Sequence, residues 1–409
     1  MGKITKVSPL APEAFPSLPV IEGVAFSAAQ AGVRYQGRTD VMLARLAPGT
    51  TMAGVFTRSA TRSAPVLDCQ AKIGLDSADG AAIIVNSGNS NAFTGKNGVV
   101  STRAVTSAVA EVLGLPETRV FSSSTGVIGE PLPHKRITAK LAELAGGLDK
   151  GAIASAARAI MTTDTFPKGA SAEVVIDGKP VKIAGIAKGS GMIAPDMATM
   201  LVYIFTDVAV ERSDLQAMLS ELTDVTFNCI TVDSDTSTSD TLLLAATGAS
   251  GVQVTQESGA FREALHSVML DLAHQVVRDG EGATKFVEVA VTGAASDADA
   301  KTHGMAIANS PLIKTAIAGE DPNWGRVVMA IGKSGAAADR DLLTIRFGDL
   351  LVAENGWVSP AYDETKAAAY MKGEYLRISV DLGLGQGKCT VWTCDLTHGY
   401  IDINADYRS

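Results

Sequence analysis

Short apolar runs alternate with longer amphipathic segments along this chain, and this alternation limits its fold more than any other feature. Residues 81–86 and 200–205 are short apolar runs that predict buried strands. Between 104 and 113 the apolar residues fall on one face of a helix instead. The pair Asp177-Gly178 separates two apolar runs and predicts a hairpin. Because hairpins are mixed with helices, we expect a mixed α/β fold in which helices layer a mixed sheet.

The second half of the chain continues this pattern. A long amphipathic helix is predicted near 258–278, and Val287, Val289 and Val291 alternate as in a strand. The glycine-rich residues 383–388 predict a hairpin turn. A smaller C-terminal α/β portion is therefore expected near 285–409. Its other predicted strands are 342–347, 375–380, 389–393 and 401–403.

Composition excludes several classes of protein. The chain has 409 residues, 46% of them hydrophobic and 19% charged, which is enough for a large core and unlike a disordered chain. The net charge is −9 and basic residues form no run, so no nucleic-acid partner is predicted. Apolar runs are too short to span a bilayer, and no secretory signal begins the sequence. We therefore expect a cytoplasmic protein with no membrane contact.

Cysteines and histidines form no metal-binding pattern. The four cysteines include no CxxC pair, so neither a zinc site nor a disulfide framework is predicted. The five histidines also lack ligand spacing. No metal and no cofactor is expected. The residues concerned are Cys69, Cys229, Cys389, Cys394, His134, His266, His274, His303 and His398.

A candidate nucleophile lies where a glycine-rich loop enters a predicted strand. Residues 188–191 lead to Ala198 and Thr199, immediately before the strand at 200–205. If the Thr199 hydroxyl attacks the carbonyl of Ala198, the peptide becomes an ester, and hydrolysis frees Thr199 as a new N-terminus. Its α-amine, with an ordinary pKa of about 7.7–8.0, can then act as base for its own hydroxyl. The residues alone leave the alternative that Thr199 is an ordinary strand residue.

Three other polar segments are candidates for a site. The segment 122–129 follows a predicted strand, and there the Thr125 hydroxyl and the Gly126 amide could form an oxyanion hole. Glu281, in the loop after the long helix, could hold a substrate ammonium. The tail 404–409 follows a predicted strand directly and could be tied down by it. Each segment also has a simpler interpretation. The segment 122–129 could be a polar turn, Glu281 could be a solvated acid, and the tail 404–409 could be a frayed terminus.

These segments together resemble the ornithine acetyltransferase (glutamate N-acetyltransferase) family of arginine biosynthesis. The resemblance covers the chain from about residue 20 to its end, and its motifs occur in the family's order. The departures are small: Ser90 replaces Ala, Ser234 replaces Gly, and the chain ends in Ser409 where the family has Thr. The matching motifs are Asn86–Gly95, Ser124–Gly129, Thr162–Thr165, Lys188–Ile193, Met197–Leu201, Ile230–Asp233, Gly319–Gly325 and Ile403–Arg408.

The resemblance implies a layered α-β-β-α sandwich of N-terminal-nucleophile type and a chain that cuts itself between Ala198 and Thr199. The products would be an α chain, 1–198, and a β chain, 199–409, assembled as two of each. Thr199 would be the nucleophile, and Thr125 and Gly126 would stabilise the oxyanion. Six residues would contact the substrate: Thr162, Lys188, Thr199, Glu281, Asn404 and Ser409.

The implied reaction is a ping-pong transfer of acetyl from N2-acetyl-L-ornithine to L-glutamate through an acetyl-Thr199 ester. Members of the family differ in whether they also accept acetyl-CoA, and we favour a bifunctional enzyme that does. Two alternatives stay open. One is an N-terminal-nucleophile amidohydrolase or aminopeptidase of related fold, and the other is a non-catalytic assembly protein.

Overall fold

The computed structural model describes residues 6–75, 77–194 and 200–405 and divides into two compact units. One unit contains residues 12–228 and 235–276. The other contains the start of the chain, residues 229–234 and everything from Val277 onward. The two units are described separately.

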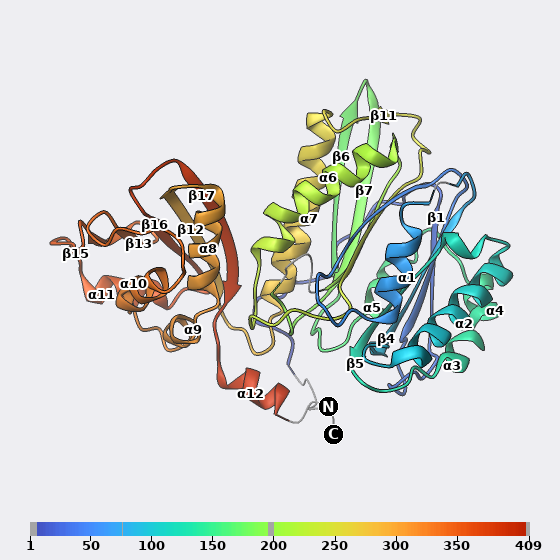
Figure 1. Cartoon of the computed structure of the whole chain (residues 1–409), viewed down its shortest axis with the longest axis horizontal. Coiled ribbons are helices and arrows are strands. Elements are labelled where there is room, and N and C mark those ends of the chain that lie inside the picture. Colours follow the sequence, from blue (N-terminus) through green and yellow to red (C-terminus); the bar gives the residue numbers. More distant parts are fainter. Residues whose placement is uncertain (1–5, 76, 195–199, 406–409) are drawn as a thin grey trace. The chain divides into compact units, whose positions relative to one another are not determined.

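The larger unit contains two main sheets (Figure 1). The first has the strand order β1-β2-β4-β5, in which β4 and β5 run parallel and the other pairs are antiparallel. The second has the order β3-β10-β8-β7-β6, with β10 and β8 parallel. The strands of the first sheet are β1 (Val24–Ala29), β2 (Val41–Leu46), β4 (Ala81–Asn89) and β5 (Val120–Val127). Those of the second are β3 (Thr51–Phe56), β6 (Lys168–Ile176), β7 (Lys179–Lys188), β8 (Leu201–Thr206) and β10 (Thr241–Ala246), while β9 (Ala209–Val210) and β11 (Gln253–Val254) form a small parallel pair.

Helices cover the outer faces of both sheets and complete an α-β-β-α sandwich (Figure 1). Apolar side chains of the two sheets, such as Phe26 and Phe205, whose ring centroids are 5.1 Å apart, meet in the central core. The outer face of the first sheet packs on α2, α3 and α4, and α6 and α7 lie on the second sheet. The mixed α/β prediction is thus confirmed. The helices are α1 (Ala64–Lys72), α2 (Gly95–Leu113), α3 (His134–Thr138), α4 (Leu141–Gly146), α5 (Ile153–Ala159), α6 (Arg212–Val225) and α7 (Gly259–Arg278), with short 3-10 turns at Glu117–Arg119 and Phe227–Cys229.

The smaller unit is built on one six-stranded sheet of order β15-β14-β13-β16-β12-β17. Helix α8 packs on β12 and on the edge strand β17. The side chain of His303, on α8, is fully buried and bonds to Ser334 and to the carbonyl of Ala337. The strands are β12 (Phe286–Ala294), β13 (Thr344–Phe347), β14 (Leu350–Glu354), β15 (Trp357–Val358), β16 (Tyr375–Asp381) and β17 (Gly387–Cys394). The helices are α8 (Asp297–Ala308), α9 (Pro311–Ala318), α10 (Trp324–Gly332), α11 (Glu364–Met371) and α12 (His398–Asn404).

The structure corrects three local predictions. Residues 401–403 lie in α12, because the Thr397 hydroxyl caps this helix by accepting from the Gly399 amide. The turn at 383–388 does not close a hairpin, since β17 pairs with β12 and β12 separates it from β16. The polar residues 122–127 are part of β5 and not a loop, because they continue the parallel ladder with β4.

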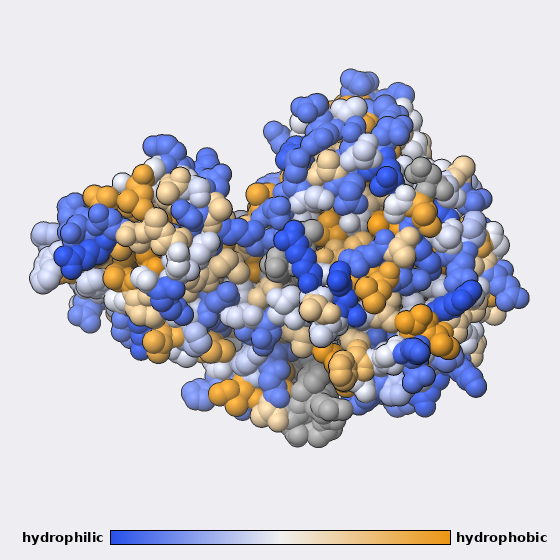
Figure 2. Space-filling view, in the orientation of Figure 1, coloured by the Kyte–Doolittle hydropathy of each residue, from blue (hydrophilic) through white to orange (hydrophobic). Residues whose placement is uncertain are grey.

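The visible surface is largely hydrophilic, with hydrophobic residues scattered among polar ones (Figure 2). Among the described residues, no helix is both long and apolar enough to cross a membrane.

Candidate active site

Thr125 and Gly126 lie near the end of β5, where this strand runs beside the end of β4. Ser87 pairs with Thr125 and Gly88 pairs with Gly126, and the register then shifts at Asn89. The backbones approach so closely that a Cβ added to Gly126 would lie 2.3 Å from the carbonyl carbon of Gly88. Gly126 also has a φ of +129°, which favours glycine. The local geometry therefore requires glycine at the position predicted to donate an amide to an oxyanion.

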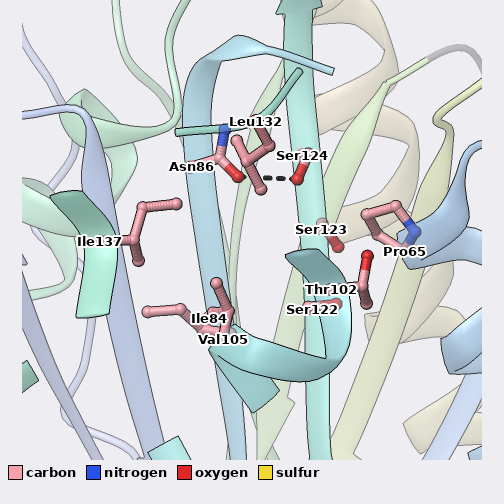
Figure 3. A pocket seen from close by; sticks show the side chains of 10 residues that line it. All are labelled: Pro65, Ile84, Asn86, Thr102, Val105, Ser122, Ser123, Ser124, Leu132 and Ile137. Atoms are coloured by element: carbon pink, nitrogen blue, oxygen red, sulfur yellow. Dashed lines mark hydrogen bonds between the residues drawn. The ribbon is translucent and has the colours of Figure 1, made fainter. Parts of the chain in front are cut away.

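The polar side chains of Ser124, on the face of β5 opposite Thr125, and of Asn86 stabilise the segment Thr125–Gly126 (Figure 3). Ser124 Oγ donates to Asn86 Oδ1 at 2.7 Å, and Asn86 Nδ2 donates to the carbonyl of Asn89 at 2.8 Å. Ser124 and Asn86 line a narrow cavity with room for about one water molecule. These bonds tie β5 to the end of β4, so the residues of the Asn86–Gly95 motif support the predicted oxyanion hole from behind.

Lys188 ends β7 and places its ammonium group against Thr125. Lys188 Nζ lies 3.2 Å from Thr125 Oγ1, and both side chains are buried. An ammonium can only donate, so Thr125 Oγ1 accepts this hydrogen bond. The hydroxyl proton of Thr125 is then left to point at another acceptor. The structure thus brings together two residues that the sequence assigned separately to oxyanion stabilisation and to substrate binding.

Asp164 connects the predicted substrate residue Thr162 with the segment that follows Lys188. Its Oδ2 accepts from the amide of Thr162 at 2.9 Å, and its Oδ1 accepts from the amide of Gly189 at 2.7 Å and from Lys168 Nζ at 2.6 Å. Burial opposes ionisation of this carboxyl, but the charges of Lys168 and Lys188 and the hydrogen bonds outweigh burial and hold its pKa well below the ordinary value. Neither Asp164 nor Lys168 is predicted as a site residue from the sequence, where the Thr162–Thr165 motif is the one signal.

Asp240 is a second buried carboxyl on the same unit. It immediately precedes β10, whose first residue, Thr241, donates its amide to the carbonyl of Met200 at 3.0 Å. Burial raises the pKa of Asp240 well above its ordinary value, although a hydrogen bond from Ser237 and the charge of Lys188 act in the opposite direction. Asp240 is therefore protonated over a pH range in which an exposed carboxyl is ionised. The sequence analysis missed this residue.

The other predicted site residues fall into two groups. Glu281 and Asn404 belong to the smaller unit, where Asn404 Nδ2 donates to Glu281 Oε2 at 2.7 Å. Glu281 is buried although it was considered as a solvated acid. Ala198, Thr199 and Ser409 lie outside the described residues. Within the described ranges, no cluster of three or more His, Cys, Asp or Glu side chains is arranged to hold a metal ion.

Comparison with known proteins decides the family. The model of the ArgJ family matches residues 25–409. The chain belongs to the ArgJ family. The arginine biosynthesis bifunctional protein ArgJ of Ruegeria pomeroyi is 76% identical over 409 residues, which is 100% of both chains. The protein of the same name from Gluconobacter oxydans is 54% identical over 414 residues, covering 100% of this chain and 97% of its own.

Solved structures of similar sequence cover about half of the chain. A crystal structure of the arginine biosynthesis bifunctional protein ArgJ from Bacillus halodurans is 42% identical, covers 51% of this chain and 99% of that one, and has a TM-score of 0.49. The ornithine acetyltransferase of Mycobacterium tuberculosis, solved in complex with ornithine, is 32% identical over 44% of this chain and 94% of that one, with a TM-score of 0.37.

Proposed function

We propose that this member of the ArgJ family transfers the acetyl group of N2-acetyl-L-ornithine to L-glutamate, giving ornithine and N-acetylglutamate. Family membership over residues 25–409, with 76% identity to a bifunctional arginine-biosynthesis protein, is the observation that carries the proposal. The geometry of Thr125 and Lys188 supports it, because acyl transfer needs a donor aimed at a developing oxyanion.

The proposed first half-reaction makes an acetyl ester. After cleavage between Ala198 and Thr199, the free α-amine of Thr199 takes the proton of its own hydroxyl, and Oγ attacks the acetyl carbonyl of N-acetylornithine. The carbonyl oxygen becomes an oxyanion that accepts from the Thr125 hydroxyl and the Gly126 amide. The C–N bond then breaks, the nitrogen receives the proton, and ornithine leaves. In the second half, the α-amine of glutamate attacks the ester and Thr199 regains its proton.

Lys188 contributes to this step through Thr125. Its ammonium donates to Thr125 Oγ1 at 3.2 Å, so the Thr125 proton is available to the oxyanion. The positive charge also makes that hydroxyl a stronger donor, as charge-assisted hydrogen bonds are stronger than neutral ones. As the resemblance implied, six residues are proposed to contact the substrate: Thr162, Lys188, Thr199, Glu281, Asn404 and Ser409.

The proposal also includes a second activity, the absence of a cofactor, the location of the enzyme and its assembly. The name bifunctional, carried by the relatives, supports a second activity as an amino-acid N-acetyltransferase that uses acetyl-CoA. We propose that the enzyme needs no cofactor, that it acts in the cytoplasm, and that two α and two β chains from one precursor assemble.

A comparison of wild type with Thr199→Ala tests the proposal. We expect mass spectrometry of the wild type to show two chains, the second beginning at Thr199, and glutamate-dependent release of ornithine. The Ala variant should remain one chain and transfer nothing. An active, uncleaved Ala variant would refute the assignment of the nucleophile.

Two further assays separate the alternatives. Release of free acetate without glutamate would identify an amidohydrolase instead. Formation of N-acetylglutamate from glutamate and acetyl-CoA alone would establish the second activity.

A further inference from the structure

A fully buried ion pair lies in the larger unit. Lys168, the first residue of β6, and Asp164, four residues earlier, pair at 2.6 Å, and neither side chain is exposed to solvent. Taking two charges out of water is expensive, and well-packed apolar residues of similar size often stabilise a core as well as such a pair. A contribution to stability therefore does not explain why a pair of charges occupies this place.

The carboxylate of Asp164 makes three contacts with different parts of the chain. It accepts from the side chain of Lys168, from the amide of Thr162 and from the amide of Gly189. Thr162 follows α5, whereas Gly189 directly follows Lys188 at the end of β7. A neighbouring bond between Thr163 Oγ1 and Ser190 Oγ, 2.6 Å long, joins the same two segments.

Only an aspartate carboxylate suits these contacts. Both of its oxygens accept, and each backbone amide donates to a different one. An asparagine offers one accepting oxygen and an NH₂ group that only donates, so it would leave one of the two amides facing a donor. A glutamate would keep the charge but move both oxygens by one methylene in a tightly packed core.

We propose that Asp164 is a positioning residue that holds the Thr162 amide and the Lys188–Gly189 segment in one geometry, and so sets the place of the Lys188 ammonium against Thr125. This inference rests on the proposed acetyl transfer. Asp164 need not touch the substrate. It acts through the 3.2 Å contact between Lys188 and Thr125, whose distance depends on where the backbone of residues 188–189 is held.

The test uses Asp164→Glu and the double variant Asp164→Asn/Lys168→Met in the full-length enzyme. The Glu variant keeps a counterion for Lys168 but displaces the oxygens. The double variant removes both charges, so no unpaired charge stays buried. For each variant, the cleaved fraction is measured on a denaturing gel, and kcat and KM for N-acetylornithine are expressed per cleaved enzyme. The urea midpoint of unfolding is measured in parallel.

We expect the double variant to stay folded, with a urea midpoint lowered by the one amide that loses its acceptor, yet to lose about 10²-fold in kcat/KM, as misplacement by about 1 Å does at active sites. The Glu variant should lose at least about tenfold on the same grounds. In both variants the loss should fall mainly on kcat and not on KM, because the displaced contact between Lys188 and Thr125 acts on the proposed oxyanion.

If either folded variant keeps kcat/KM within about threefold of an active wild type, or if the loss falls on KM while kcat is unchanged, Asp164 is only a structural counterion and the inference fails. A wild type that transfers no acetyl group would instead refute the proposed function. The two failures are therefore distinguishable in one set of assays.

Discussion

Two glycines of one segment allow the close packing of the oxyanion site to be measured. Gly126 and Gly129 both have positive φ, +129° and +86°. A Cβ on Gly129 would meet no heavy atom within 4 Å, whereas one on Gly126 would lie 2.3 Å from the Gly88 carbonyl carbon and 2.7 Å from the Asn89 amide nitrogen. Gly129→Ala therefore introduces backbone strain alone, and Gly126→Ala introduces strain and overlap with backbone that cannot rotate away.

The expected magnitudes follow from these two contributions. Strain at positive φ costs about 1–2 kcal/mol, which is the whole expected effect of Gly129→Ala on the free energy of unfolding. Overpacking of a core adds about 1–3 kcal/mol, so Gly126→Ala should destabilise by about 2–5 kcal/mol. Because β5 must shift to accommodate the methyl group, the amide of residue 126 also moves. We expect kcat to fall by about 10²–10³-fold, as for the loss of one oxyanion donor.

Urea unfolding and steady-state acetyl transfer measure the two effects. Gly129→Ala should keep kcat within about threefold of the wild type, since its amide is not assigned to the oxyanion and a displacement below 1 Å costs less than 10²-fold. Equal urea midpoints and equal kcat values for the two alanine variants would show that the contact between β5 and β4 is not as close as described, and would refute the reasoning.

Three other perturbations have expected outcomes. Thr125→Val should lower kcat by about 10²–10³-fold at little cost in stability, whereas Thr125→Ser should retain most activity, as measured by ornithine release. The raised pKa of Asp240 means that the folded protein keeps a proton that the unfolded chain loses, so stability should fall as pH rises above about 4 until the folded pKa is passed. In urea unfolding from pH 5 to 8, Asp240→Asn should lose less stability than the wild type, and parallel profiles would contradict the assignment. A hydrogen bond with Cys229 lowers the pKa of Cys389, while burial raises the pKa of Cys69 to about 12, so Cys389 should react first with an aromatic disulfide reagent and Cys389→Ser should abolish that fast phase.

Strands were predicted correctly from the sequence where burial on both faces leaves an uninterrupted run of apolar residues. The runs 81–86 and 200–205 correspond to β4 and β8, which are buried on both faces and so lack polar interruptions. A hairpin was likewise correct at Asp177-Gly178, because a two-residue turn is a local signal. No strand was assigned at 24–29 or at 41–56, although β1, β2 and β3 are short apolar runs of the same kind.

The predictions from sequence failed where the structure of a segment is decided by a contact with residues far away in the sequence. Three alternating residues, 401–403, fit a helix as well as a strand, and Ile401 is largely exposed in α12. The glycines of 383–388 indicate a turn but not which strand will be the neighbour of β17. Asp164 could not be recognised from its own surroundings, since its bond to Gly189 joins residues that are 25 positions apart.

The buried charges near Thr125 support the proposed stabilisation of an oxyanion at this residue. Lys168 and Lys188 supply two ammonium groups, and the lowered pKa of Asp164 makes it their ionised partner. Burial raises the pKa of Asp240, so at pH values between the two pKa values this second carboxyl is neutral and does not oppose the charge of Lys188. The ammonium of Lys188, which donates to Thr125 Oγ1 at 3.2 Å, places a positive charge beside the hydroxyl that is proposed to stabilise the oxyanion. Ionisation of Asp240 at high pH would place a negative charge near Lys188, so transfer should weaken there even with every hydrogen-bond donor in place, and less so in Asp240→Asn.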